Sequence, residues 1–200
     1  MLNPDDGQNV YIQQNFKNIN LAQARLNSKE FDNCIFKDCN FSETIFQNCK
    51  FYECEFTGCN LSLIKIKACN FFDVVFEDCK LIGINWTEAT WPKVKLSSPF
   101  KFYKCSLNYA SFFGLSMKEM IMTECSAKEV NFREADCTEA NFSYTDFSGS
   151  LFNHTLLIRA DFSEATNYDI NVFENEVKKA KFSLPEAIRL LNYLDIEIVE

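Results

Sequence analysis

Cysteine is the residue type in this chain that could do the most chemistry. Ten cysteines occur in 200 residues, beside a single histidine, His154. Metal sites and redox sites usually place two cysteines in a C-x-x-C pair, and the chain has no such pair. Most of the cysteines instead fall a multiple of five positions apart: Cys34, Cys39, Cys49, Cys54, Cys59, Cys69 and Cys79.

The five-residue step belongs to the whole chain. Residues 34–81 carry a large apolar side chain at every fifth position, which we call the centre, and a smaller side chain two positions earlier. Seventeen centres run from Phe16 to Leu96, and after a one-residue shift thirteen more run from Phe102 to Phe162. A step of five matches neither an α-helix nor a flat strand, so it indicates a repeat architecture.

The repeat predicts a square coil. The centre and the small residue before it are both apolar, so we expect both to point inward while the polar positions face solvent. Four such turns close a coil of about 20 residues, and equivalent residues of successive coils then stack at about 4.8 Å, as in parallel strands. The predicted result is a filled rod of about eight coils, roughly 40 Å long. One expected ladder is Phe16, Phe36, Phe56, Phe76 and Leu96.

The repeat resembles that of the pentapeptide-repeat proteins, whose consensus is A(D/N)LXX. Copies here include Cys69-Asn70-Phe71 and Ala160-Asp161-Phe162. The resemblance covers about residues 10–182 and implies an all-β fold, a right-handed quadrilateral β-helix. The five-residue step of the repeat continues through Val172, Val177 and Phe182, and the polar residue Asn167 occupies one centre.

Two segments are predicted. Residues 1–182 form the β-helix, interrupted by one residue near 97–101, where Pro99 predicts a bulge. Residues 183–200 form a C-terminal cap. A cluster of lysines near the interruption is either a solvated corner or an interaction patch: Lys93, Lys95, Lys101 and Lys104.

The cysteines are predicted to be reduced and buried. Nine of them, Cys105 and Cys125 included, occupy the small inward position, and Cys137 is a centre. Stacked positions have parallel Cβ vectors, which suit disulfides poorly, so packing as small apolar side chains is favoured over metal binding. We expect no metal and no cofactor. Buried free thiols, an N-terminus unlike a signal peptide and the lack of a long apolar run predict a cytoplasmic protein without membrane contact.

The segment 183–200 carries a different pattern. Ser183, Pro185 and Glu186 predict a helix start with an N-cap and a capping box, and Ile196–Val199 predicts a short strand. This element could cover its own coil end or pair two copies end to end. We favour the homodimer, because the segment has more apolar surface than one coil end can cover. The expected interface is Leu184, Ile188, Leu191, Leu194, Ile196 and Ile198.

Acidic residues gather in the second half. Residues 119–176 hold twelve acidic and three basic residues, whereas the first hundred residues are nearly balanced. Five glutamates recur two positions after successive centres and therefore point outward. Their charge either only keeps the rod soluble or attracts a basic partner. The candidate binding residues are Glu119, Glu124, Glu129, Glu134 and Glu139.

The sequence does not predict an enzyme. The one histidine is outward, glycines are few and a filled rod offers no concave site, so we assign no catalytic residue. Two functions remain. One is a protein that imitates the charged rod of DNA and binds a basic groove, with no nucleic acid as partner. The other is a scaffold or interaction module with another protein partner.

The whole chain resembles the quinolone-resistance branch of the family, the Qnr and MfpA proteins. The shared features are a repeat with one interruption, an acidic second half and a C-terminal helix followed by an apolar strand over residues 190–199. The resemblance implies a dimer that binds the type II topoisomerases DNA gyrase and topoisomerase IV and reduces inhibition by quinolones. The longer loops that help protection in that branch are absent here, so the resemblance implies gyrase binding more firmly than strong protection.

Overall fold

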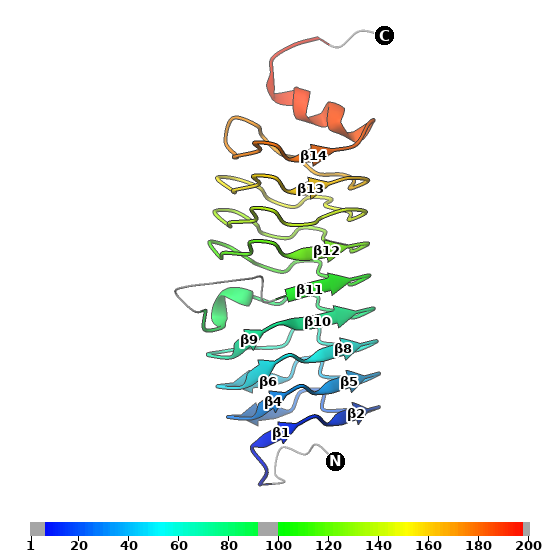
Figure 1. Ribbon diagram of the computed structural model, residues 1–200, viewed down its shortest axis with the longest axis vertical. Helices are drawn as coiled ribbons and strands as arrows, with labels where there is room; N and C mark the ends of the chain where they lie inside the picture. Colours follow the sequence, from blue (N-terminus) through cyan, green and yellow to red (C-terminus); the bar gives the residue numbers. More distant parts are fainter. Residues whose placement is uncertain (1–6, 92–99, 198–200) are drawn as a thin grey trace.

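The computed structural model describes residues 7–91 and 100–197, and in it the chain is a parallel β-solenoid of about eight turns (Figure 1). This confirms the predicted β-helix. The coils stack from the N-terminal end to a helix at the other end, and the strands pair in parallel with strands of the coils above and below. The pairing follows the orders β1-β4-β7-β9, β2-β5-β8-β10-β11-β12, β3-β6 and β13-β14.

The strands are short, because each coil turns after a few residues. Their bounds are β1 Val10–Ile12, β2 Asn15–Lys17, β3 Arg25–Asn27, β4 Glu30–Asp32, β5 Ile35–Lys37, β6 Ile45–Gln47, β7 Lys50–Tyr52, β8 Glu55–Thr57, β9 Asn70–Phe72, β10 Val74–Glu77, β11 Phe100–Tyr103, β12 Ile121–Thr123, β13 Asp161–Phe162 and β14 Lys181–Phe182. Two 3₁₀ helices complete the described elements: η1 Trp86–Glu88 and η2 Glu186–Tyr193.

Aromatic ladders fill the interior. Phe36 pairs in register with Phe16 of the preceding coil and with Phe56 of the following coil. The Phe36 and Phe56 rings are stacked with centroids 4.5 Å apart, and the Phe56 and Phe76 rings follow at 5.1 Å. The side chains at the centres therefore point inward as predicted, and together they form a packed core.

The turn between units depends on the residue two positions after each centre, which we call the corner. Corners adopt positive φ, such as 53° at Asp38 and 49° at Glu53. This region disfavours most L-residues, and corner amides compensate with a hydrogen bond to the next coil, as from Asp38 N to Thr57 O at 2.9 Å. Gly58 is also a corner, and a Cβ there would lie 2.8 Å from Asp38 Oδ1.

The cysteines are all free and buried, as predicted. They do more than fill space, because each thiol at the small inward position donates to a carbonyl of the preceding coil. Cys59 Sγ lies 3.4 Å from Phe36 O, and Thr145 Oγ1 makes the equivalent bond to Met122 O at 2.8 Å. Burial raises the pKa of the Cys54 thiol to about 12. The Cys54 thiol therefore stays neutral and unreactive at pH 7.

The interruption is longer than the sequence indicates. Phe76 pairs with Phe102, 26 residues later, so this coil is six residues longer than a regular coil of 20. The predicted ladder from Phe76 to Leu96 is wrong, since Phe102 stacks on Phe76 at 5.3 Å. Five of the six extra residues leave the phase of the repeat unchanged, which is why only one extra residue was apparent. Leu96, Pro99, Lys93 and Lys95 lie outside the described residues.

A second irregularity occurs near the end of the solenoid. Asn167, predicted as a centre, is exposed, whereas Tyr168 and Ile170 are buried. Phe152 bridges to Ile170, two positions before the regular partner Val172, whereas Leu156 bridges to Glu176 in the regular register. The large Tyr168 side chain takes the inward place, so the predicted centres Asn167 and Val172 are wrong. Two extra residues in an outward turn after Ile170 then restore the regular register at Glu176.

The C-terminal helix forms, but its predicted start is wrong. Helix η2 begins at Glu186 after Pro185, and no side chain caps it. Ser183 Oγ instead accepts a hydrogen bond from Glu164 N at 3.1 Å, and Glu186 Oε1 accepts one from Asn167 N at 2.6 Å. These side chains are used to satisfy amides of the last coil. Ile196 and Glu197 are not in a strand, and the rest of the predicted strand lies outside the described residues.

Candidate acidic interface

The five predicted glutamates all lie at corners and are exposed. Their φ angles are positive, from 54° at Glu129 to 60° at Glu139. Successive members occupy successive corners, so they encircle the rod and do not form one flat face. Only Glu119 and Glu139, one coil apart, share a corner. A partner on one side of the rod therefore meets some of these carboxylates and not others.

Acids on the flat faces are neutralised by lysines. Lys118 Nζ lies 3.2 Å from Asp136, Lys128 Nζ lies 3.1 Å from Asp146, and Lys181 Nζ lies 2.8 Å from Asp161. Each pair joins neighbouring coils. These three lysines are thus committed to contacts within the solenoid.

Four corner glutamates retain free charge. Glu139 is ion-paired with Arg159 of the next coil. Within residues 7–91 and 100–197, the side chains of the other four make no ion pair and no hydrogen bond. Among the described residues, one turn of corners therefore carries four carboxylates without an ion partner: Glu119, Glu124, Glu129 and Glu134.

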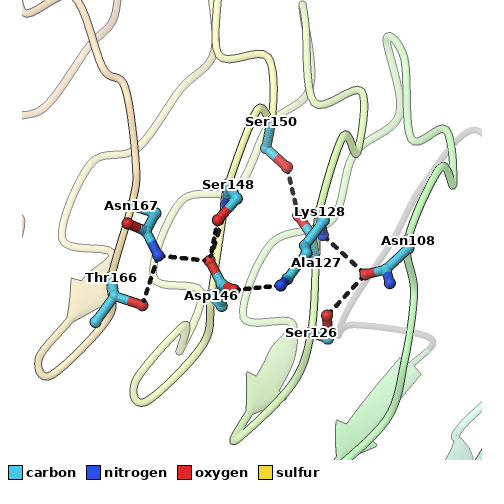
Figure 2. Close-up of polar contacts among 9 residues, drawn as sticks. All are labelled: Asn108, Ser126, Ala127, Lys128, Asp146, Ser148, Ser150, Thr166 and Asn167. Atoms are coloured by element: carbon cyan, nitrogen blue, oxygen red, sulfur yellow. Dashed lines mark hydrogen bonds and ion pairs between the residues drawn. The ribbon is translucent and has the colours of Figure 1, made fainter.

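Asp146 organises the polar network on one flat face, as Figure 2 shows. Its Oδ1 accepts hydrogen bonds from Ser148 Oγ at 2.6 Å and Asn167 Nδ2 at 2.9 Å, while Lys128 contacts Oδ2. Asn108 Oδ1 accepts from the Lys128 amide at 3.0 Å. The network links successive coils and holds exposed Asn167 where the repeat loses its register.

The same contacts set the ionisation of Asp146. Partial burial acts to raise the pKa of this carboxyl, but the hydrogen bonds from Ser148 and Asn167 and the contact with Lys128 outweigh it and lower the pKa to about 2. Asp146 is therefore a carboxylate throughout the physiological range.

We expect this network to make the free energy of unfolding depend on pH in the acidic range. The unfolded pKa is about 3.9, so the contribution is complete above about pH 5 and is lost as the pH falls toward 2. Because the carboxyl is partly exposed, we expect roughly 1 kcal/mol. Urea unfolding at pH 6 and at pH 2 should show a smaller acid loss for Asp146→Asn than for the natural chain. Asp32→Asn, at a carboxyl with no ion pair among the described residues, should leave the loss unchanged; equal losses in all three proteins would contradict the assignment.

The described residues of the predicted dimer interface lie on the exposed side of η2 (Ile188 and Leu191) or next to its ends (Leu184, Leu194 and Ile196), and we call this the outer side of η2. Ala187, Leu190 and Tyr193 are half-buried toward the last coil. The opposite side of the segment is exposed, and Ile198 lies outside the described residues. The exposed apolar side chains are Leu184, Ile188, Leu191, Leu194 and Ile196.

Sequence reasoning missed the lysine partners of the acids. The signal was a Lys that precedes an Asp by two positions less than one full coil, as in Lys118 with Asp136 and Lys128 with Asp146. Because the coils stack, this spacing puts the two side chains on one face in adjacent coils. Counting charge along the chain does not show such pairing.

The described surface carries acidic residues but no metal-binding cluster. Across residues 7–91 and 100–197, no group of three or more His, Cys, Asp or Glu side chains could hold a metal ion. His154 is exposed at a corner. Among the described residues, no helix has the length and apolar character needed to cross a bilayer. The arrangement is suited to binding a positively charged surface.

Comparisons with known proteins agree with this fold. A family model for the pentapeptide repeat region matches residues 29–98 and 89–162. The chain is similar to the crystal structure of HetL, a pentapeptide repeat protein involved in heterocyst differentiation regulation in the cyanobacterium Nostoc sp. strain PCC 7120, with 18% identity, 88% of each chain covered and a TM-score of 0.57. It is also similar to trypsin-treated QnrB1, a plasmid-mediated fluoroquinolone resistance protein, with 20% identity, 99% of this chain and 94% of that chain covered, and a TM-score of 0.51. A search of curated proteins finds no match.

Proposed function

This chain belongs to the pentapeptide-repeat family, and we propose that it is a non-enzymatic DNA mimic that binds a type II topoisomerase. The proposed partners are DNA gyrase and topoisomerase IV. The bound protein would reduce the inhibition of these enzymes by quinolones. The observation that carries the proposal is the turn of four glutamates without ion partners among the described residues. Their carboxylates would take the place of DNA phosphates.

The arrangement of charge supports a partner with a basic groove. Duplex DNA presents one charge per roughly 1.7 Å of axis, and proteins bind it through lysine and arginine. Glu124 and Glu129 project from adjacent corners, so a groove that embraces one face could contact both at once. The flat face between them adds hydrogen-bonding groups without added net charge at the Lys128–Asp146 pair.

The direct test is supercoiling by DNA gyrase at low salt, with and without a quinolone. Excess protein should change supercoiling on its own or restore it in the presence of the drug. Binding should weaken steeply as salt is added, because exposed charges are screened. The absence of any effect of excess protein, with or without the drug, would reject the proposal for that enzyme.

We also propose that the protein acts as a homodimer joined through the outer side of η2. Exposed apolar side chains on one side of a short helix favour association, because burial removes them from water. The polar anchors Ser183 and Glu186 fix the helix to the last coil, so its apolar side is presented outward in a defined orientation. This arrangement supports an end-to-end dimer.

Light scattering tests the dimer. Ile188→Asp combined with Leu191→Asp should convert the dimer to a monomer, because two charges would be buried in the interface. Leu63→Asp is a matched control, since Leu63 is an exposed apolar residue on the side of the rod. A monomeric natural protein, or dissociation caused equally by the control, would contradict the proposed interface.

A scaffold function is the second candidate. The inter-coil ion pairs of Asp136, Asp146 and Asp161 use acidic residues for stability, so part of the acidity has a structural purpose. A scaffold would still bind a protein partner but would not alter gyrase activity. The supercoiling assay therefore separates the two candidates.

A further inference from the structure

A pocket lies beside the register change near the C-terminus. Ile170 pairs with the preceding coil two residues earlier than in the regular register, and Glu176 pairs in the regular register. The segment 171–175 therefore contains two extra residues and forms a turn that projects from the rod. A pocket of about 260 Å³ lies against this turn and the end of η2. The residues of its wall that matter here are Leu151, Phe152, Asn153, Asp169, Glu174 and Tyr193.

Two carboxylates in the pocket are held in place with one oxygen each to spare. The Tyr193 hydroxyl donates to Asp169 Oδ1 at 2.6 Å, and Asn153 Nδ2 donates to Glu174 Oε2 at 2.9 Å. Among the described residues, Asp169 Oδ2 and Glu174 Oε1 have no hydrogen-bond or ion partner. No lysine or arginine is among the described residues that line the pocket.

The turn that carries Glu174 is firmly anchored. Asn175 is buried, and its Nδ2 donates to Phe152 O at 2.8 Å and to Asn171 O at 2.9 Å. Its Oδ1 accepts a hydrogen bond from Thr155 N at 2.9 Å. The inward amide therefore fixes the base of the turn, so the pocket exists before any ligand arrives.

Size and chemistry restrict the ligand. Pockets for drug-sized molecules usually measure about 300–1,000 Å³, so this smaller one suits a single side chain. Two carboxylates with free oxygens need a cation that donates several hydrogen bonds. A planar guanidinium has five donors and also packs well against aromatic rings, one of which Tyr193 supplies here.

We propose that this pocket binds the guanidinium group of an arginine presented by a protein partner. The site is separate from the corner glutamates and does not depend on the topoisomerase proposal. The bound arginine would add a specific contact to a protein interface in which the corner glutamates contribute only charge. The pocket lies close to the end of the solenoid that carries η2.

The test uses the full chain and a small probe, N-acetyl-arginine methylamide, titrated into the ¹⁵N-labelled protein. We expect saturable shifts at residues 150–153 and 169–174 and at Tyr193, with a Kd on the order of millimolar for so small a ligand. Glu174→Gln should weaken binding about tenfold, because one charge-assisted hydrogen bond is lost. Glu77→Gln removes the same charge from an exposed site elsewhere and should change nothing.

Each alternative outcome overturns the proposal. These outcomes are shifts that never saturate, shifts spread over the acidic corners, and equal weakening by Glu77→Gln. The acetylated lysine methylamide is the competing probe, and tighter binding of lysine would reject the guanidinium assignment. Unchanged thermal unfolding of Glu174→Gln verifies that the variant is folded. Since no topoisomerase is present, failure here leaves the supercoiling result unaffected.

Discussion

Phe56→Ala should lower the free energy of unfolding by about 3–5 kcal/mol, as expected for a buried aromatic residue. The Phe56 ring stacks between those of Phe36 and Phe76, at 4.5 and 5.1 Å, and only 2% of the residue is exposed. Its removal would leave a cavity bounded by stacked coils. The coils are tied by backbone hydrogen bonds on both sides, so they cannot readily collapse to fill it.

Urea unfolding followed by tryptophan fluorescence measures this effect. Trp86 is fully buried and its ring lies 6.2 Å from that of Phe76, so its emission reports on the core. Phe72→Ala is the control, because Phe72 is 55% exposed on β9 and should contribute within about 0.5 kcal/mol. Similar losses in the two variants would contradict the inward placement of the centres. In a stack of coils unfolding can proceed in stages, so amide hydrogen exchange should also show the largest loss of protection near Phe56.

The regular part of this fold could be predicted because one rule repeats. A large centre at every fifth position fixes both the inward direction and the coil of four units, so the stack of Phe16, Phe36, Phe56 and Phe76 followed directly. The rule does not prevent a coil from being longer than 20 residues. Five extra residues do not change the phase of the repeat, so Phe102 can occupy the place predicted for Leu96 above Phe76 while the sequence shows a shift of only one residue.

The ends of the solenoid depend on competition between neighbouring side chains. Near Asn167 the repeat would place a polar residue in the core, and the chain shifts so that Tyr168 is buried instead. At Ser183 and Glu186, side chains typical of a helix start bind amides of the coil below. Both outcomes depend on contacts with the adjacent coil, which local capping rules do not consider.

The candidate interface was predicted only in outline. Outward positions for the glutamates follow from their place after each centre. Which of them keep free charge depends on neighbours one coil away: Arg159 pairs with Glu139, while Glu119 has no such partner among the described residues. The pocket beside Glu174 arises from the register change itself, so a regular repeat could not predict it.

Replacing the four free corner glutamates with glutamine should weaken topoisomerase binding by roughly 5- to 30-fold. Each exposed ion pair contributes about 0.5–1 kcal/mol, and a groove on one side of the rod contacts two of the four, which amounts to about 1–2 kcal/mol. The fold should be unchanged, because these side chains are exposed and make no hydrogen bond or ion pair among the described residues. The variant carries Glu119→Gln, Glu124→Gln, Glu129→Gln and Glu134→Gln.

The control removes four charges from the first half of the rod, where lysines and acids are nearly balanced. It carries Glu53→Gln, Glu55→Gln, Glu77→Gln and Glu88→Gln, all at exposed positions. Binding to gyrase should be measured for both variants over a range of salt concentrations. If the corners imitate phosphates, the corner variant should also show a shallower salt dependence, whereas the control should keep the natural slope. Equal weakening by the two variants would mean that only total charge matters, and binding insensitive to salt would reject phosphate mimicry by the acidic corners.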